Sequence, residues 1–505
     1  METIQLLLQG FAVAFSPQNL LLCSIGVITG TIVGALPGIG SAGACAILLP
    51  ATFKLGPVGS LIMLAGIFYG TQYGGTITSV LMKVPGESAS VVTMFDGNPL
   101  AKQGRAGVAL GLAAIGSFIG GTLSIVALML FGPVLAGYAL ELGPAEYFSL
   151  MVLSLSLVCA FTGSSMVRGL ISTCFGLILA LVGQDIMTGQ PRLTFGLQQL
   201  LDGVEFLPVA VGMFGLSETI ESLEKKESME MVKADLGFFK VLPSIRDLRQ
   251  SFWPMIRGTG VGFFIGIFPG AGPTISSFIS YGLEQRISRH PEQFGKGALA
   301  GVAGPETANN AATGGAMVPM LSLGIPSSPS TAIMLAALIL FGLKPGPSLF
   351  REAPEVVWGL IGSLYIGNVM LVIVNLAGIP LIVLFMDRIR AYLPLAILLL
   401  SAFGVYSYRN SVFDIGVMLL FALVGYAMRK IEFPQAPVIL GVLLGGAAES
   451  SLRQAMVLSD GNPAIFVTRP ISAVFLCLTL AALIVPPLLL RRRPAQDSGR
   501  AEGSS

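Results

Sequence analysis

Two stretches of the chain, one in each half, share a pattern of glycine and proline. Residues 30–40 read GTIVGALPGIG and residues 262–272 read GFFIGIFPGAG. Five positions are identical, and each lies 232 residues from its counterpart. Proline removes a backbone donor and glycine frees the backbone, so each stretch should break a helix inside an otherwise apolar segment. The repetition predicts a fold built from two related copies.

The composition around these stretches is that of a membrane protein. The 505 residues are 53% hydrophobic and 11% charged, with a mean hydropathy of +0.81. An ordinary soluble domain is about 25% charged, which excludes a water-soluble enzyme. At about 20 apolar residues per helix, the length accommodates roughly 10 to 12 crossings. We therefore predict an all-α polytopic membrane protein.

The few charged and metal-ligating residues narrow the function further. A net charge of +2 excludes nucleic acid as a main ligand. The five cysteines form no C-x-x-C pair and the single histidine, His290, lies in a charged stretch, so we expect no cofactor and no resident metal. The chain has no G-x-x-x-x-G-K-[ST] motif, which favours secondary over nucleotide-driven transport.

Landmarks in the two halves follow the same order and divide the chain. We predict five parts: a first membrane repeat (1–221), a charged linker (222–250), a second membrane repeat (251–470), an extra C-terminal transmembrane helix (471–490) and a disordered tail (491–505).

The distribution of basic residues predicts the orientation of these parts. The basic linker and the Arg491–Arg493 run should lie in the cytoplasm, and the N-terminus, which has no nearby Lys or Arg, outside it in the periplasm. A first repeat that begins outside and ends at a cytoplasmic linker crosses an odd number of times. The second repeat should then be inverted, and the tail cytoplasmic.

The two broken stretches are candidate binding elements. Paired breaks at repeat-related positions are typical of transporter sites, and the helix after each break offers free N–H groups to a carboxylate. The alternative is that proline and glycine serve only kinks and close packing. The predicted substrate-binding residues here are Pro37, Gly38, Gly40, Ser41, Pro269, Gly270, Gly272 and Thr274.

A second pair of stretches, 69–76 and 305–315, places amide, hydroxyl and carboxyl groups in apolar surroundings. Such groups should line a path or coordinate a cation through oxygen. We assign cation coupling to Glu306, Thr71, Gln72 and Thr313, and substrate contact to Asn309 and Asn310. The alternative is interhelical hydrogen bonding, worth about 0.6–2 kcal/mol per contact.

A third pair, 84–90 and 325–331, again breaks an apolar run and begins a helix with hydroxyl residues. We add five residues from this pair to the predicted substrate site: Pro85, Gly86, Pro326, Ser327 and Ser328. The charged residues Lys83, Glu87 and Asp96 either contact the ligand or lie at the membrane interface. Glu218 and Glu449, near the ends of the two halves, are weaker candidates.

Several of these motifs together resemble one transporter family. The stretches 34–40, 73–79, 84–87, 95–107, 305–311 and 323–326 are similar to the TctA family, the large membrane subunit of tripartite tricarboxylate transporters. The resemblance covers about residues 10–490 and implies a bacterial inner-membrane importer of citrate-like carboxylates. It also implies two partners, a small TctB-like membrane subunit and a periplasmic TctC-like solute-binding protein. Ser327 departs from the pattern, because the family more often has glycine there.

The leading hypothesis is a cation-coupled carboxylate symporter that uses H+ or transiently bound Na+. Each positive charge that moves inward gains about 2.3 kcal/mol per 100 mV, so excess cations can drive uptake of an anion. A passive carboxylate channel is the second hypothesis. An intramembrane enzyme is the third, although Asp96, Asp185, Asp202 and Asp414 form no recognisable catalytic pair.

Overall fold

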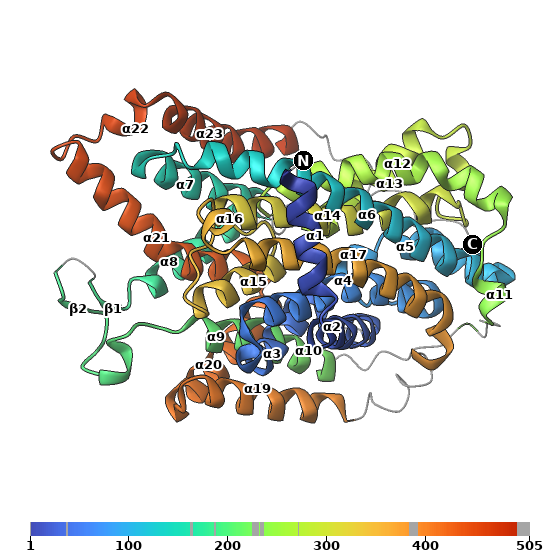
Figure 1. Ribbon diagram of the computed structural model, residues 1–505, viewed down its shortest axis with the longest axis horizontal. Helices are drawn as coiled ribbons and strands as arrows, with labels where there is room; N and C mark the ends of the chain where they lie inside the picture. The colour runs from blue at the N-terminus through green and yellow to red at the C-terminus, as the bar shows by residue number, and fades with distance from the viewer. Residues whose placement is uncertain are drawn as a thin grey trace, which may run out of the picture.

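The computed structural model is almost entirely helical. It describes residues 2–36, 39–161, 165–185, 188–224, 232, 237–270, 272–382 and 392–491. Within these residues the only strands are β1 (Gly183–Gln184) and β2 (Pro191–Arg192), which pair antiparallel in one small hairpin (Figure 1). The prediction of an all-α fold is confirmed.

The helices of the first half run from the N-terminus to the linker. Their bounds are α1 Glu2–Ala14, α2 Pro17–Ala35, α3 Gly40–Thr52, α4 Gly56–Met82, α5 Thr93–Leu100, α6 Ala106–Ala139, α7 Pro144–Phe161, α8 Met166–Ala180, α9 Phe206–Ala210 and α10 Ser217–Glu224, with short turns η1 Phe53–Leu55, η2 Ser88–Ser90, η3 Ala101–Arg105, η4 Gln198–Leu200 and η5 Val211–Leu216.

The second half repeats this sequence of long and short helices. Its elements are α11 Phe238–Val241, α12 Ile245–Ile267, α13 Gly272–Ile287, η6 Pro291–Gln293, α14 Ala300–Leu323, α15 Pro329–Leu340, α16 Leu349–Glu352, α17 Pro354–Ala377, α19 Leu393–Arg409, α20 Val412–Lys430, α21 Ala436–Leu458, α22 Ile465–Thr468 and α23 Pro470–Arg491.

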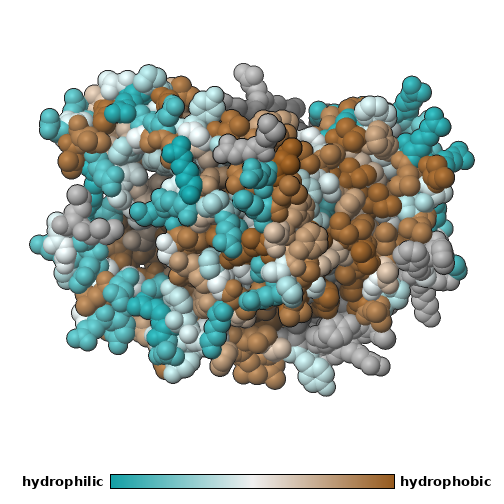
Figure 2. All heavy atoms as spheres, in the orientation of Figure 1, coloured by the Kyte–Doolittle hydropathy of each residue, from teal (hydrophilic) through white to brown (hydrophobic). Residues whose placement is uncertain are grey.

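Seven helical segments of the described chain are long and apolar enough to cross a membrane. Five further apolar helices are shorter, because breaks divide the chain into half-length pieces. Figure 2 shows the apolar residues spread over the middle of the molecule, with hydrophilic residues gathered toward the two ends of its long axis. A multi-pass membrane protein follows from these helices.

Glycines bring one pair of helices into backbone contact in each half. In the first half α2 packs on α4, and a Cβ on Gly30 would lie 2.5 Å from the carbonyl oxygen of Ile67. In the second half α12 packs on α14, and a Cβ on Gly262 would lie 2.1 Å from the carbonyl oxygen of Ala308. Only glycine permits this approach, so the two contacts fix the same helix pair at positions 232 and 241 residues apart.

The helices α4 and α14 form the centre of the fold. They lie in the middle of Figure 1, with α23 and α19 at opposite edges, and nearly every residue of both is buried. Their polar residues are therefore enclosed by protein rather than exposed to lipid. This placement concentrates buried polar groups at one level of the molecule.

Candidate functional site

Helix breaks occur at both predicted positions. In the first half α2 ends at Ala35 and α3 begins at Gly40, and in the second half α12 ends at Ile267 and α13 begins at Gly272. Gly40 and Gly272 have φ angles of +62° and +51°, a region in which glycine is favoured. The predicted Pro37 and Gly38 lie outside the described residues.

A second turn follows the central helix of each half. We call residues 83–90, after α4, tip 1, and residues 324–331, after α14, tip 2. Lys83 and Gly324 both adopt the left-handed conformation, and their N–H groups donate to the carbonyls of Thr78 and Pro319. Both pairs are 241 residues apart, so the two tips follow the same backbone path.

The two helix starts and the two tips meet at one cavity of about 340 Å³. Its polar lining comes from both halves and consists of Gly40, Ser41, Gln72, Glu87, Ser88, Glu218, Gly270, Gly272, Thr274, Ser327, Ser328 and Ser330. Its apolar lining includes Phe68, Phe161 and Phe214. None of the described residues that line it is Lys or Arg.

Hydroxyl groups join each tip to the helix start of the other half. The hydroxyl of Ser88 in tip 1 lies 2.8 Å from that of Thr274 in α13. The hydroxyl of Ser330 at tip 2 donates to that of Ser41 in α3 over 3.0 Å. The cavity is therefore closed by contacts between the halves.

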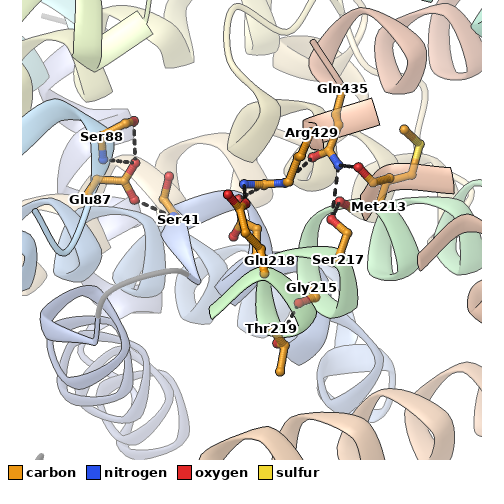
Figure 3. A network of polar contacts seen from close by, with 12 residues as sticks. Ser41, Glu87, Ser88, Met213, Gly215, Ser217, Glu218, Thr219, Arg429 and Gln435 are labelled. Carbon is orange, nitrogen blue, oxygen red and sulfur yellow. Dashed lines mark hydrogen bonds and ion pairs between the residues drawn. The ribbon is translucent and has the colours of Figure 1, made fainter. Parts of the chain in front are cut away.

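Glu87 occupies the start of α3. Its Oε2 accepts the backbone N–H of Ser41 at 2.5 Å, and its Oε1 accepts the N–H and hydroxyl of Ser88 at 3.2 and 3.1 Å (Figure 3). A carboxylate at a helix N-terminus is stabilised by the free amides and by the helix dipole. The protein thus already places one carboxylate where a ligand's carboxylate was expected.

Glu218 brings a second carboxyl to the cavity, on the side opposite Glu87 in Figure 3. Its Oε1 accepts a short hydrogen bond from Arg429, which also pairs with Glu221 at 3.1 Å and donates to Gln435 at 3.2 Å. Its Oε2 is buried and has no hydrogen-bond partner among the described atoms. Arg429 is thus engaged behind the wall by two carboxylates.

A separate buried cluster surrounds Glu306 in α14. Thr93 of α5 donates a short hydrogen bond to Glu306 Oε1, and the Asn309 amide lies 3.4 Å from Oε2. The Asn310 amide donates to Ser117 of α6 at 2.7 Å. The side-chain oxygens of both asparagines are buried without a hydrogen-bond partner in the described structure. An unmade bond of this kind costs about 1–3 kcal/mol, which favours a ligand or water there.

The structure gathers only part of the predicted substrate site around the cavity. Seven predicted residues line it: Gly40, Ser41, Gly270, Gly272, Thr274, Ser327 and Ser328. Pro85, Gly86, Pro269 and Pro326 do not line it; they belong to the turns that shape the tips and breaks. Asn309 and Asn310 lie in the Glu306 cluster instead.

The four predicted coupling residues are also divided. Glu306 lies in the buried cluster, whereas Gln72 lines the cavity with both amide atoms unpartnered among described atoms. The hydroxyls of Thr71 and Thr313 donate to carbonyls of their own helices, from Phe68 at 2.7 Å and Asn309 at 3.2 Å. For these two threonines the geometry agrees with the packing alternative.

Sequence reasoning gave too little weight to the two acidic residues of the cavity. Glu87 follows the Val84–Gly86 turn, so its place in a motif was a usable signal. Glu218 was grouped with Glu449, but Glu449 pairs with Arg192 at 2.8 Å, beside the small hairpin. The aromatic wall carried no signal, because Phe68 and Phe214 read as ordinary apolar residues.

Comparisons with known proteins agree with this arrangement. The model of the tripartite tricarboxylate transporter TctA family matches residues 20–440. An uncharacterized 52.8 kDa protein in the TAR-I ttuC' 3' region of Agrobacterium vitis is 43% identical over 490 residues, 96% of each chain. A protein in the TAR-II ttuC' 3' region of the same organism is 41% identical over 228 residues, covering 44% of this chain and 93% of the relative.

No solved structure matches. The family match spans most of the chain, and that family is one of transporters rather than enzymes. The chain is a member of the tripartite tricarboxylate transporter TctA family.

Proposed function

We propose that this chain carries a citrate-like carboxylate into the cell together with a cation, H+ or Na+. The observation that carries the proposal is the meeting of two helix starts and two tips, one of each from each half, at one cavity. Backbone amides and the hydroxyls of Thr274, Ser328 and Ser330 supply donors for a carboxylate there. A cavity of about 340 Å³ is large enough for a small polycarboxylate.

The charges around the cavity support coupling to a cation. Glu87 and Glu218 both face it, while Arg429 is shared between Glu218 and Glu221. A carboxylate that enters therefore meets negative groups and no free cation among the described lining residues. Like charges at close range in a medium of low dielectric repel strongly. A proton or metal cation that enters with the substrate removes this repulsion and links the two fluxes.

We place the coupling role at Glu306 and its asparagine neighbours, because their buried oxygens have no other described partner. Glu306→Gln should change the dependence of uptake on the Na+ or pH gradient more than it changes substrate affinity. Glu355→Gln, an exposed carboxyl at the start of α17, is the matched control. A gradient dependence equal to that of wild type would remove Glu306 from coupling.

The remaining parts of the proposal concern assembly and orientation. A TctB-like small subunit and a periplasmic TctC-like binding protein would deliver substrate, in a bacterial inner membrane. The repeated contacts of Gly30 and Gly262 support two related halves. We propose that the halves have inverted topology, with a periplasmic N-terminus and a cytoplasmic C-terminus, and alternate access to the cavity.

The decisive experiment is uptake of labelled di- and tricarboxylates into proteoliposomes that contain this chain, its small subunit and its binding protein. Imposed Na+ and pH gradients are compared with symmetric buffers. Accumulation above the outside concentration that follows one gradient is the expected result. Equilibration without accumulation would favour a channel, and no flux of any carboxylate would contradict the substrate class.

A further inference from the structure

An open cleft of about 650 Å³ lies apart from the central cavity and shares no lining residue with it. Most of its wall comes from the 95–107 motif, which the transport site leaves unused. The lining residues are Lys83, Met94, Phe95, Asn98, Pro99, Lys102, Gln103, Tyr281, Gly295 and Lys296.

Three lysines face this cleft from three elements. Lys83 ends α4, Lys102 lies in η3 and Lys296 lies in the loop before α14. All three are exposed, and none forms an ion pair with any residue that the structure describes. Three unpaired positive charges around one cleft attract an anion with more than one negative charge.

The backbone around the cleft is held in place by buried contacts. Asp96, one of the charged residues of the motif, is fully buried and accepts the N–H groups of Gly297 and Ala298, both at 2.8 Å, and the hydroxyl of Tyr281 at 3.0 Å. Gln103 donates to the carbonyl of Lys296 at 2.8 Å. The lysines are therefore presented by a fixed frame that joins the two halves.

Lys83 occupies a backbone position that favours glycine. Its φ is +56°, whereas the matching position in the second half is Gly324, with φ +70°. A lysine in the left-handed conformation carries a steric cost that glycine avoids. The first half bears this cost at the residue that points a positive charge into the cleft.

The cleft lies at the linker end of the molecule. The N–H of Val232 in the linker donates to the carbonyl of Leu81 at 2.9 Å, and Lys240 packs on Gly107 at the start of α6. The apolar part of α6 begins there, and Phe95 at the cleft rim is 41% exposed. Basic pockets with an apolar rim, at the end of membrane helices, suit the headgroups of acidic phospholipids.

We propose that this cleft binds a phosphate-bearing anion, with the lysines on the phosphate and Phe95 and Met94 against acyl carbon. The headgroup of an anionic phospholipid has both parts, whereas free phosphate has only the first. This inference does not depend on what the central cavity carries. Because Lys83 begins tip 1, an occupied cleft also holds the base of that tip.

Native mass spectrometry and a binding titration test the proposal on the full chain in detergent. The probes are short-chain phosphatidylglycerol, short-chain phosphatidylcholine and inorganic phosphate. The test variant is Lys102→Gln/Lys296→Gln. The control is Lys54→Gln/Lys344→Gln, which removes two exposed lysines that lie outside the cleft and leaves the same net charge.

We expect wild type and control to bind phosphatidylglycerol at least about tenfold more tightly than the test variant, and phosphatidylcholine weakly. Displacement of the lipid by millimolar inorganic phosphate would identify a soluble anion as the ligand; its absence would identify the headgroup. Equal binding by the test variant and the control, for both phosphatidylglycerol and phosphate, would overturn the proposal. Thermal melting of both variants establishes that each is folded.

Discussion

Tip 1 and tip 2 have the same backbone path but different chemistry. In both, the residue that follows the left-handed turn donates its N–H to the same carbonyl as that turn, Val84 to Thr78 and Ile325 to Pro319. The side chains then diverge, because Glu87 stands in tip 1 where Ser328 stands in tip 2. A duplicated scaffold has kept its folding contacts while one copy gained a carboxylate.

The consequence is that the two helix starts are not equivalent. Glu87 reaches across to the amide of Ser41 and occupies the start of α3. Ser328 caps its own helix instead, by accepting the N–H of Thr331 at 3.2 Å. The start of α13 therefore receives no carboxylate from tip 2. We expect a substrate carboxylate to bind on that side and the charge-dependent steps to depend on tip 1.

The largest effect should follow from giving tip 1 the residue of tip 2 at position 86. A Cβ on Gly86 would lie 2.1 Å from the carbonyl oxygen of Gly34, although the matching Ser327 is accommodated. Gly86→Ser should cost about 3 kcal/mol of stability, because backbone must move. Thermal melting in detergent measures it, with Gly137→Ser, which meets no neighbour, as control. Equal melting of the two variants would show that the tips differ less than the contacts indicate.

The next effect concerns the charge at tip 1. Glu87→Gln keeps the size of the side chain but removes the negative charge from the start of α3. We expect the uptake rate to fall by about tenfold or more, with a smaller change in melting temperature. Glu355→Gln is the control for loss of an exposed carboxyl. If Glu87→Gln transported at the wild-type rate with the wild-type gradient dependence, the carboxylate of tip 1 would have no part in coupling.

A smaller effect is expected from the cap of tip 2. Ser328→Ala removes the N-cap of α15 and should cost about 1 kcal/mol of stability. Because Ser328 also lines the cavity, it should weaken substrate binding as well. Ser16→Ala removes the N-cap of α2, away from the cavity, and should lower stability without changing the KM for uptake. An unchanged KM in both variants would argue against substrate contact at Ser328.

The smallest effect should come from Ser327→Gly, which gives tip 2 the residue of tip 1. The Ser327 hydroxyl makes one long contact, 3.5 Å to the carbonyl of Ala316. We expect a stability change within about 1 kcal/mol and little change in uptake. A large loss of uptake with normal melting would instead assign a substrate contact to this hydroxyl.

The sequence predicted the helix breaks well, because proline and glycine act locally on the backbone. Gly40 and Gly272 begin helices where the repeat placed them. Contacts between distant segments were harder to predict. The bond from Ser41 to Glu87 joins residues 46 positions apart, and the bond from Ser330 to Ser41 joins the two halves. No spacing rule identifies which tip meets which helix start.

Polar residues on one helix were also difficult to assign to one site. Gln72 and Thr76 lie four residues apart on α4, so they share one side of the helix. Gln72 lines the cavity, whereas Thr76 does not. Asn309 and Asn310 were assigned to the substrate but lie beside Glu306. Periodicity finds the polar side of a helix, but only packing decides which pocket each residue reaches.

The hydroxyl pairs that join the halves set an energy scale for conformational exchange. The Ser88–Thr274 and Ser330–Ser41 bonds each contribute about 0.5–1.5 kcal/mol, a small amount for a seam inside a membrane protein. A substrate that binds one arrangement only tenfold better shifts its population by about 1.4 kcal/mol, which is comparable. Such weak, renewable bonds allow the seam to open and reclose at thermal energies, so the ligand itself can determine which arrangement is populated.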